Sequence, residues 1–184
     1  MKHNLNWLLQ KVVSEEHMKY LFFWGHQPSK DGRIQASCFS QWWAGHPFDE
    51  DGITYATTEH YMMAGKAKLF EDNEILEQII ACETAPEAKK LGRKVRNFES
   101  HIWEQYRCSI VTRGNELKFG QHEELKAFLL GTGERVIVEA SPRDRIWGIG
   151  MGKNNPSASQ PTEWKGQNLL GFCLMEVRDL LGKE

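Results

Sequence analysis

The segment TTEHYMMAGKAK, at residues 57–68, has the pattern of a capped helix with one chemically mixed face. The threonine pair at its start offers a hydroxyl that can accept a hydrogen bond from the first free amides of a helix. The i, i+3, i+4, i+7 spacing then places four residues on one face: Glu59, Met62, Met63 and Lys66. An acid and an amine about 10 Å apart along the helix axis therefore flank a methionine surface. The segment fits either a surface helix, in which Glu59 complements the helix dipole, or one wall of a functional site.

The length and composition indicate one soluble domain with a substantial core. Of the 184 residues, 40% are hydrophobic and 26% are charged. The net charge of -2 and the pI of about 6.4 provide no overall attraction to nucleic acid or to anionic membranes. A small nucleotide or one extruded base still fits a local pocket. The seven tryptophans supply flat faces that stack well on bases.

The cysteines and the apolar segments indicate a cytoplasmic protein. The cysteines are far apart and form no CxxC or Cys/His cluster, which favours free thiols over disulfides or a zinc site: Cys38, Cys82, Cys108 and Cys173. No apolar run reaches membrane-spanning length, and the first ten residues lack the features of a signal peptide. We therefore expect no metal, no other cofactor and no membrane association.

The remaining apolar patterns predict short strands separated by helices. Residues 4–18 resemble a short amphipathic helix, which we interpret as an N-terminal extension (residues 1–19) added to a domain spanning residues 20–184. Strands are expected at 20–24, 53–55 and 136–138, and helices within 72–118, at 123–130 and after 166–171. In residues 35–43, Ser40 and Gln41 lie between aromatic residues. That segment fits equally a pocket lining or a strand end with Trp42 and Trp43 in the core.

The strand at 136–138 continues into the segment EASPRDRIWGIG, at residues 139–150, which has the composition of a site loop. Gly148 and Gly150 permit a positive φ or a close approach of a ligand to the backbone. A structural turn explains the glycines, but it does not explain the combination of Glu139, Asp144 and Trp147. The polar residues 151–163 that follow are expected to form a mobile lid.

Two other patterns favour ordinary structure over function. The basic residues between positions 89 and 96 are expected on a solvated helix face, with a phosphate-facing role for one member as the less favoured alternative. Trp103 continues a helical apolar stripe and is expected in the core on spacing alone.

The polar residues at the predicted element ends suit cleavage of a glycosidic bond. Three carboxylates (Glu59, Glu139 and Asp144) recur there with the amine of Lys66 and several tryptophans. Glycosidic cleavage develops positive charge on the sugar, which a carboxylate stabilises while it aligns or deprotonates water. The lysine either neutralises a phosphate or attacks the anomeric carbon as a Schiff-base nucleophile. A helix N-terminus lowers the pKa of Glu59 and an apolar pocket raises it, and the sequence leaves the balance open.

Short motifs also occur in order along the chain: FSQW (39–42), TEHY and AGK (58–61 and 64–66), GR (92–93), WE (103–104), KF (118–119), EASPRDRIWGIG (139–150), and NLLG and LMEVR (168–171 and 174–178). Together they resemble the YbiA-like, or NADAR, family from about Leu21 to the C-terminus. The resemblance implies a single α+β N-glycosidase domain, with a small β-sheet surrounded by helices. Some members hydrolyse ribosylaminopyrimidine 5′-phosphates of the early riboflavin pathway, and others remove ADP-ribose from guanine in nucleic acid.

The resemblance also implies a set of site residues. By motif position, the catalytic residues are Glu59, Lys66 and Asp144. The substrate-binding residues by the same comparison are Phe39, Ser40, Gln41, Trp103, Trp147 and Gly148. The chain departs from the family pattern at Gln41, where asparagine is common; glutamine keeps the amide on a longer arm.

The resemblance therefore predicts a cofactor-independent N-glycosidase. Its expected partner is a small phosphorylated ribosyl or ADP-ribosyl substrate, including ADP-ribosylated guanine in nucleic acid. The alternative is a non-catalytic module that binds ADP-ribose or a related nucleotide. A binding module can dispense with Glu59 and Lys66, so their presence favours the enzyme.

Overall fold

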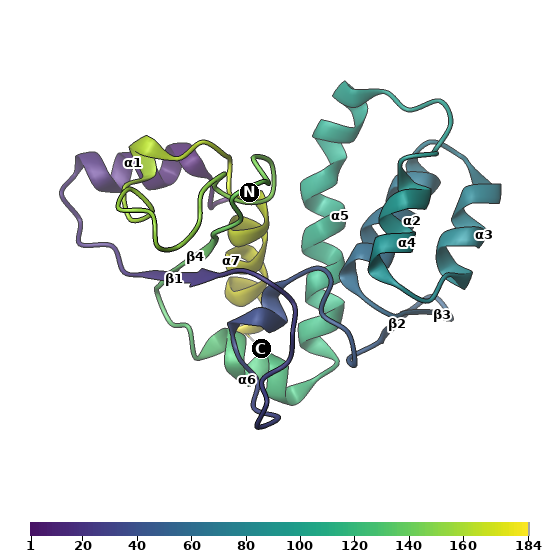
Figure 1. Ribbon diagram of the computed structural model, residues 1–184, viewed down its shortest axis with the longest axis horizontal. Helices are drawn as coiled ribbons and strands as arrows, with labels where there is room; N and C mark the ends of the chain where they lie inside the picture. The colour runs from purple at the N-terminus through teal and green to yellow at the C-terminus, as the bar shows by residue number, and fades with distance from the viewer. Residues whose placement is uncertain (184) are drawn as a thin grey trace.

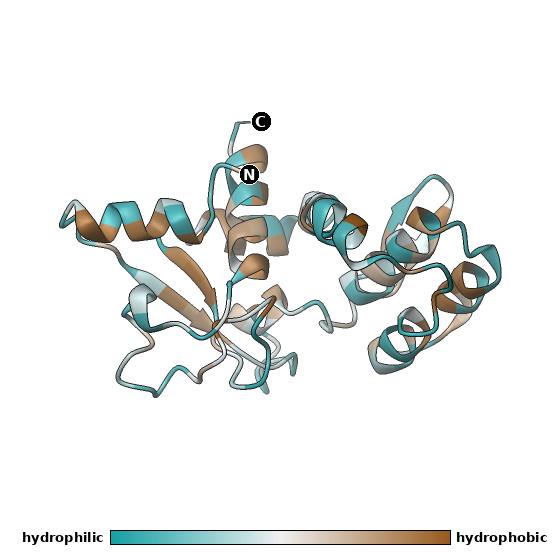
Figure 2. Cartoon of the chain, turned by 90° about the horizontal axis from the view of Figure 1, so that it is seen from above, coloured by the Kyte–Doolittle hydropathy of each residue, from teal (hydrophilic) through white to brown (hydrophobic). Residues whose placement is uncertain are grey.

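A computed structural model describes residues 1–183, and helix α5 (Ser100–Gly120) lies between two groups of elements in it (Figure 1). One group contains α1 (Leu5–Val13), β1 (Tyr20–Phe23), β4 (Val136–Glu139), α6 (Glu123–Leu130) and α7 (Leu169–Leu181). The other contains β2 (Phe48–Glu50), β3 (Ile53–Tyr55), α2 (Thr58–Leu69), α3 (Asn73–Ala81) and α4 (Ala85–Gly92). Seen from above, the groups remain on opposite sides of α5 (Figure 2). The architecture is α+β, as expected.

The strands form two separate two-stranded sheets. β1 pairs with β4 in parallel, from Tyr20 opposite Val136 to Phe23 opposite Glu139, and β2 pairs with β3 as an antiparallel hairpin. Parallel pairing brings the C-terminal ends of β1 and β4 to the same edge, where a polar loop follows β4. The strands predicted at 20–24, 53–55 and 136–138 are confirmed.

The prediction that residues 35–43 form the end of a strand is wrong. The segment forms the 3-10 helix η1 (Ala36–Phe39) and then a turn. Cys38, Phe39 and Trp43 are buried in the core, so the segment supplies apolar side chains without joining a sheet. The alternation of aromatic and polar residues therefore reflects a tight helical turn.

The N-terminal segment is fastened to α7. The side chain of Asn4 caps α1 by accepting the N–H of Trp7 at 2.8 Å, and Leu8 is buried in the core. The backbone N–H of His3 donates to Glu176 of α7 at 2.6 Å. The helix ends at Val13, earlier than the periodicity through residue 18 predicts.

A buried asparagine joins α7 to β4 and to the loop between them. Asn168 adopts a left-handed conformation (φ 54°) at the start of α7 and is fully buried. Its Nδ2 donates to the carbonyl of Ile137 and its Oδ1 accepts the N–H of Glu139, both at 2.9 Å. Its own N–H donates to the carbonyl of Gly148 at 3.1 Å. Gly171 completes the contact, since a Cβ there would lie 2.1 Å from the carbonyl oxygen of Ile137.

No helix within residues 1–183 combines the length and the apolar character needed to cross a membrane.

We predict that Asn168→Ala destabilises the protein by about 3 kcal/mol, because it leaves a buried N–H and a buried carbonyl without partners. Chemical denaturation measures the free energy of unfolding. Asn154→Ala is the matched control, since Asn154 is exposed on a loop. Equal stability of the two variants would contradict the role given to Asn168.

Candidate active site

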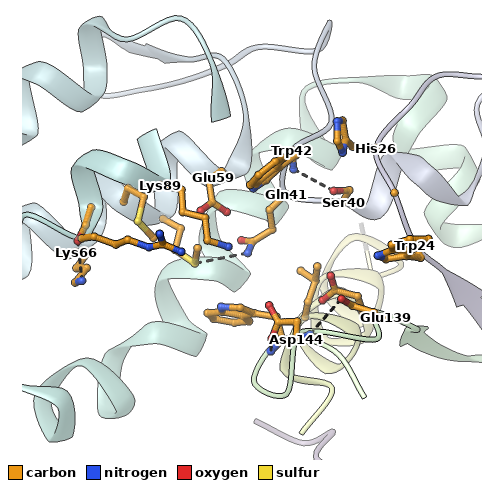
Figure 3. A pocket seen from close by; sticks show the side chains of 18 of the residues that line it. Trp24, His26, Ser40, Gln41, Trp42, Glu59, Lys66, Lys89, Glu139 and Asp144 are labelled. Atoms are coloured by element: carbon orange, nitrogen blue, oxygen red, sulfur yellow. Dashed lines mark hydrogen bonds between the residues drawn. The ribbon is translucent and has the colours of Figure 1, made fainter. Parts of the chain in front are cut away.

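A cavity of about 470 Å³ lies between the two groups of elements. Figure 3 shows Gln41, Glu59 and Lys89 on one side of it and Glu139 and Asp144 on the opposite side. Most of the residues expected at a site line this cavity: Ser40, Gln41, Glu59, Lys66, Trp103, Asp144 and Trp147. The cavity therefore collects side chains that are distant in the sequence.

Helix α2 contributes one face of the cavity wall. Thr57 caps the helix, with its hydroxyl accepting from the N–H of His60, as the threonine pair suggested. The cavity is lined by the four residues that share the predicted helix face: Glu59, Met62, Met63 and Lys66. The shared face is thus confirmed, and it forms a cavity wall instead of a surface.

The segment after η1 is held between α5 and α2. Lys118 of α5 is fully buried, and its Nζ donates to the carbonyls of Cys38 at 2.6 Å and Ser40 at 3.3 Å. The N–H of Glu59 donates to the carbonyl of Gln41 at 2.9 Å. These bonds place the short Ser40–Gln41 backbone beside the first turn of α2.

Glu59 places a buried carboxyl group on the α2 wall of the cavity. It is 2% exposed, and its Oε1 has no hydrogen-bond partner among the described residues. Burial raises the pKa of Glu59 to about 7, although Lys89 and a hydrogen bond from Trp42 act in the opposite direction. Burial therefore outweighs the lowering influences of Lys89, Trp42 and Arg93, and the pKa of Glu59 lies above its usual value.

The opposite wall is the loop that follows β4. Oδ1 of Asp144 accepts the N–H groups of Ile146 and Trp147, both at 2.8 Å, and so folds the loop that carries Trp147. Gly148 lies behind this wall, where a Cβ would lie 2.8 Å from the carbonyl oxygen of Glu139. The glycine is thus needed for close packing of the loop on β4.

Three cations line the cavity: Lys66, Lys89 and Arg93. The Nζ of Lys66 donates to the carbonyl of Gly92 at 2.7 Å and lies 4.1 Å from the centroid of the Phe98 ring. Burial lowers the pKa of Lys66. Lys89 and Arg93 come from the basic run expected on a solvated face; both line the cavity, and Arg93 is also exposed to solvent as expected.

Two residues proposed for substrate binding lie outside the cavity lining that the described residues form: Phe39 and Gly148. Phe39 is fully buried and packs against the rings of Phe23 and Phe128. Trp43 is in the core, as the strand-end alternative expected, whereas Trp42 lines the cavity beside Ser40 and Gln41. Trp103 packs against the core, as its helical spacing predicted, and it also lines the cavity.

The sequence did not single out several cavity residues, among them Trp24, His26 and Ser141. Trp24 directly follows β1, so its place at the shared end of two parallel strands is the signal that could have marked it as a candidate. No group of three His, Cys, Asp or Glu residues within positions 1–183 is arranged to hold a metal ion.

Residues 151–163, expected to form a lid, do not contribute to the cavity lining in the described part of the chain. Met151 and Ala158 are buried, and the indole N–H of Trp164 donates to the carbonyl of Ala158 at 2.8 Å. The segment is thus anchored at Met151 and Ala158, and its interpretation as a lid stays a prediction.

The sequence model of the NADAR domain matches residues 22–182. The chain belongs to the NADAR domain family. It is 42% identical to N-glycosidase R617 of Acanthamoeba polyphaga mimivirus, over 88% of this chain and 95% of the relative. It is 33% identical to N-glycosidase YbiA of Escherichia coli (strain K12), over 80% of this chain and 81% of that protein.

The NMR structure of the E. coli protein YbiA has the same fold, with a TM-score of 0.70 at 30% identity. The similarity covers 90% of this chain and 86% of that one. The NADAR resemblance and the α+β fold are thereby confirmed. Helix α1 precedes the matched residues 22–182, and its interpretation as an added element stays a prediction.

We predict that Glu59→Gln stabilises the folded protein at pH 8 by about 1–3 kcal/mol relative to wild type, with little difference near pH 4.5. The pKa of Glu59 is raised from 4.5 to about 7 on folding, so the folded state binds more protons across this interval and wild-type stability falls as pH rises through it. Denaturation at both pH values measures the effect.

Glu77→Gln is the control for this pH dependence, because Glu77 is exposed on α3. If Glu59→Gln and wild type differ in free energy of unfolding by the same amount at both pH values, the prediction is contradicted. Ionisation of Glu59 would then not destabilise the folded protein.

Proposed function

We propose that this protein hydrolyses the N-glycosidic bond between a phosphorylated ribose and a nitrogenous base. It is a hydrolase of N-glycosyl compounds, the class named in its relatives R617, YbiA and Npun_R5314. The observation that carries the proposal is the buried carboxyl of Glu59, whose Oε1 has no partner within residues 1–183 and which shares its cavity with tryptophans and cations.

The carboxyl of Glu59 suits the charge that develops in this reaction. As the bond to the base breaks, the ribose ring gains oxocarbenium character, which a nearby carboxylate stabilises. The same carboxylate can take a proton from the attacking water. Its pKa of about 7 leaves it partly ionised at neutral pH, in the range expected of a general base.

The cations favour one orientation of the substrate. In Figure 3, Lys66 lies at one end of the cavity, Trp24 and His26 lie at the other, and Glu59 lies between. A ribose phosphate held by Lys66, Lys89 and Arg93 places its anomeric carbon towards the carboxylates. The base then extends towards the aromatic residues, which offer faces for stacking.

Lys66 retains the two roles considered for it. Its lowered pKa would help a nucleophile, whereas its neighbours and its bond to the carbonyl of Gly92 suit a phosphate anchor. We assign it to the phosphate, because in Figure 3 it lies at the end of the cavity away from Glu139 and Asp144.

Two substrates carry the required chemistry. One is a ribosylaminopyrimidine 5′-phosphate of the early riboflavin pathway, and the other is ADP-ribosylated guanine. In both, a ribose with a 5′-phosphate group is joined to an amino-substituted base. We propose that one of these two is the physiological substrate.

We predict that wild-type protein releases free base from one of these substrates, and that Glu59→Gln reduces kcat by about 100-fold or more while still binding it. The loss follows from removing the negative charge with little change of shape. Base release is measured by chromatography for wild type, Glu59→Gln and the exposed control Glu77→Gln.

The outcomes separate the competing functions. Saturable binding without base release by the wild type would support a nucleotide-binding module and contradict the enzyme proposal. Wild-type turnover by Glu59→Gln would leave the reaction intact but remove Glu59 from its mechanism.

A further inference from the structure

We propose that Glu139 is the general acid that protonates the departing base. This assignment rests on the N-glycosidase function proposed above and adds a second catalytic carboxyl group to it.

The backbone of Glu139 is held from both sides. Glu139 is the last residue of β4, and its N–H donates to Oδ1 of the buried Asn168 at 2.9 Å. Its carbonyl accepts the N–H of Ile149 at 3.0 Å. The parallel pairing of β4 with β1 fixes its position along the strand, opposite Phe23. Because the backbone is constrained in this way, the side chain of Glu139 is held in place and can act as a positioned proton donor.

The side chain faces the cavity from the wall opposite Glu59. Figure 3 shows Glu139 and Asp144 together across the cavity from Glu59. Oε2 of Glu139 is buried and has no hydrogen-bond partner in the described part of the chain. By contrast, Oδ1 of Asp144 already accepts two backbone N–H groups of its own loop. Glu139 therefore keeps a buried oxygen without a hydrogen-bond partner among residues 1–183, whereas Asp144 uses its Oδ1 to fold its own loop.

The charged groups around Glu139 favour its protonated form. Burial is the largest influence, and the nearby carboxyls of Asp144 and Glu59 add to it, while Lys89 opposes it. Together they raise the pKa of Glu139 to about 8, so the group carries its proton at neutral pH. A protonated Glu139 on the wall opposite Glu59 places an acid and a base on the two sides of the substrate.

The chemistry of the leaving group requires such a donor. When the C1′–N bond breaks, its electron pair goes to the nitrogen of the base, which leaves poorly as an anion. Glu139 gives its proton to that nitrogen, while the oxygen of water bonds to C1′ and a water proton passes to Glu59. The products are a free base with a new N–H bond and a ribose with a new O–H bond. Proton exchange with solvent restores both carboxyl groups.

The test compares wild type, Glu139→Gln and the control Glu134→Gln on the substrate that the wild type hydrolyses. Glu134 is exposed shortly before β4, so its substitution is expected to leave kcat unchanged. Glu139→Gln keeps the shape but has no acidic proton, and we expect kcat to fall about 100-fold or more with KM within a few-fold of wild type. Thermal denaturation verifies that the variant is folded.

The pH profile adds a readout that a structural role would not move. Wild-type activity is expected to rise through the pKa of Glu59 and to decline above about pH 8, where Glu139 loses its proton. Glu139→Gln should lose this alkaline decline. An analogue with an electron-poor base, which leaves more easily without protonation, should narrow the gap between the variant and wild type.

Infrared difference spectroscopy at pH 7 checks the protonation state without turnover. The C=O stretch of a protonated carboxyl should be present in wild type and reduced in Glu139→Gln. Absence of that difference, wild-type kcat in the variant, or a rise in KM alone would overturn the proposal. If the wild type releases no base from either substrate, both the proposed function and this role of Glu139 fail. If the wild type releases base and Glu139→Gln releases it at the same rate, only the role of Glu139 fails.

Discussion

The side-chain amide of Asn168 makes the contact on which one wall of the cavity depends. It joins the start of α7 to the backbone of β4 through Ile137 and Glu139, and its own N–H holds the loop at Gly148. A left-handed residue at this point lets the amide serve both strand and helix, and asparagine is among the few residues that accept that conformation readily. Buried polar groups of this kind hold one arrangement because leaving any member unpaired is costly.

The second wall depends on a different buried polar group. Lys118 of α5 holds the carbonyls of Cys38 and Ser40, and the next carbonyl along the segment, that of Gln41, accepts the first-turn N–H of Glu59. Each wall is thus fixed by backbone hydrogen bonds to buried side chains. The cavity places carboxyl groups from both walls in one poorly solvated space, where burial raises the pKa of both Glu59 and Glu139. Asp144 raises both pKa values further, and Glu59 also raises that of Glu139. This arrangement reduces stability at alkaline pH and supplies two carboxyl groups suited to proton transfer near neutrality.

The local patterns of the sequence predicted much of the fold. The mixed face of α2 was visible from spacing, because a helix places Glu59, Met62, Met63 and Lys66 together wherever it packs. The β-branched run of β4 and its polar continuation likewise indicated a strand and a site loop. By contrast, the 3-10 turn at η1 was missed, because tertiary packing of Cys38 and Phe39 decides it.

What the sequence did not reveal depends on how the elements pack. The basic residues Lys89 and Arg93 face the cavity only because α4 packs against α2, and a charged run looks the same whether it faces solvent or a ligand. Trp24 required knowledge of the parallel β1–β4 pair. Phe39 shows the opposite case, since it adjoins site residues in a motif yet points into the core.

A crystal structure of Glu59→Gln with the uncleaved substrate that the wild type hydrolyses tests the proposed reaction most directly. We expect the anomeric carbon between position 59 and Glu139, the 5′-phosphate at Lys66 and Arg93, and the base towards Trp24 and His26. A phosphate at the Trp24 end, a covalent bond between Lys66 and the sugar, or a ribose bound outside the cavity would contradict the proposed reaction.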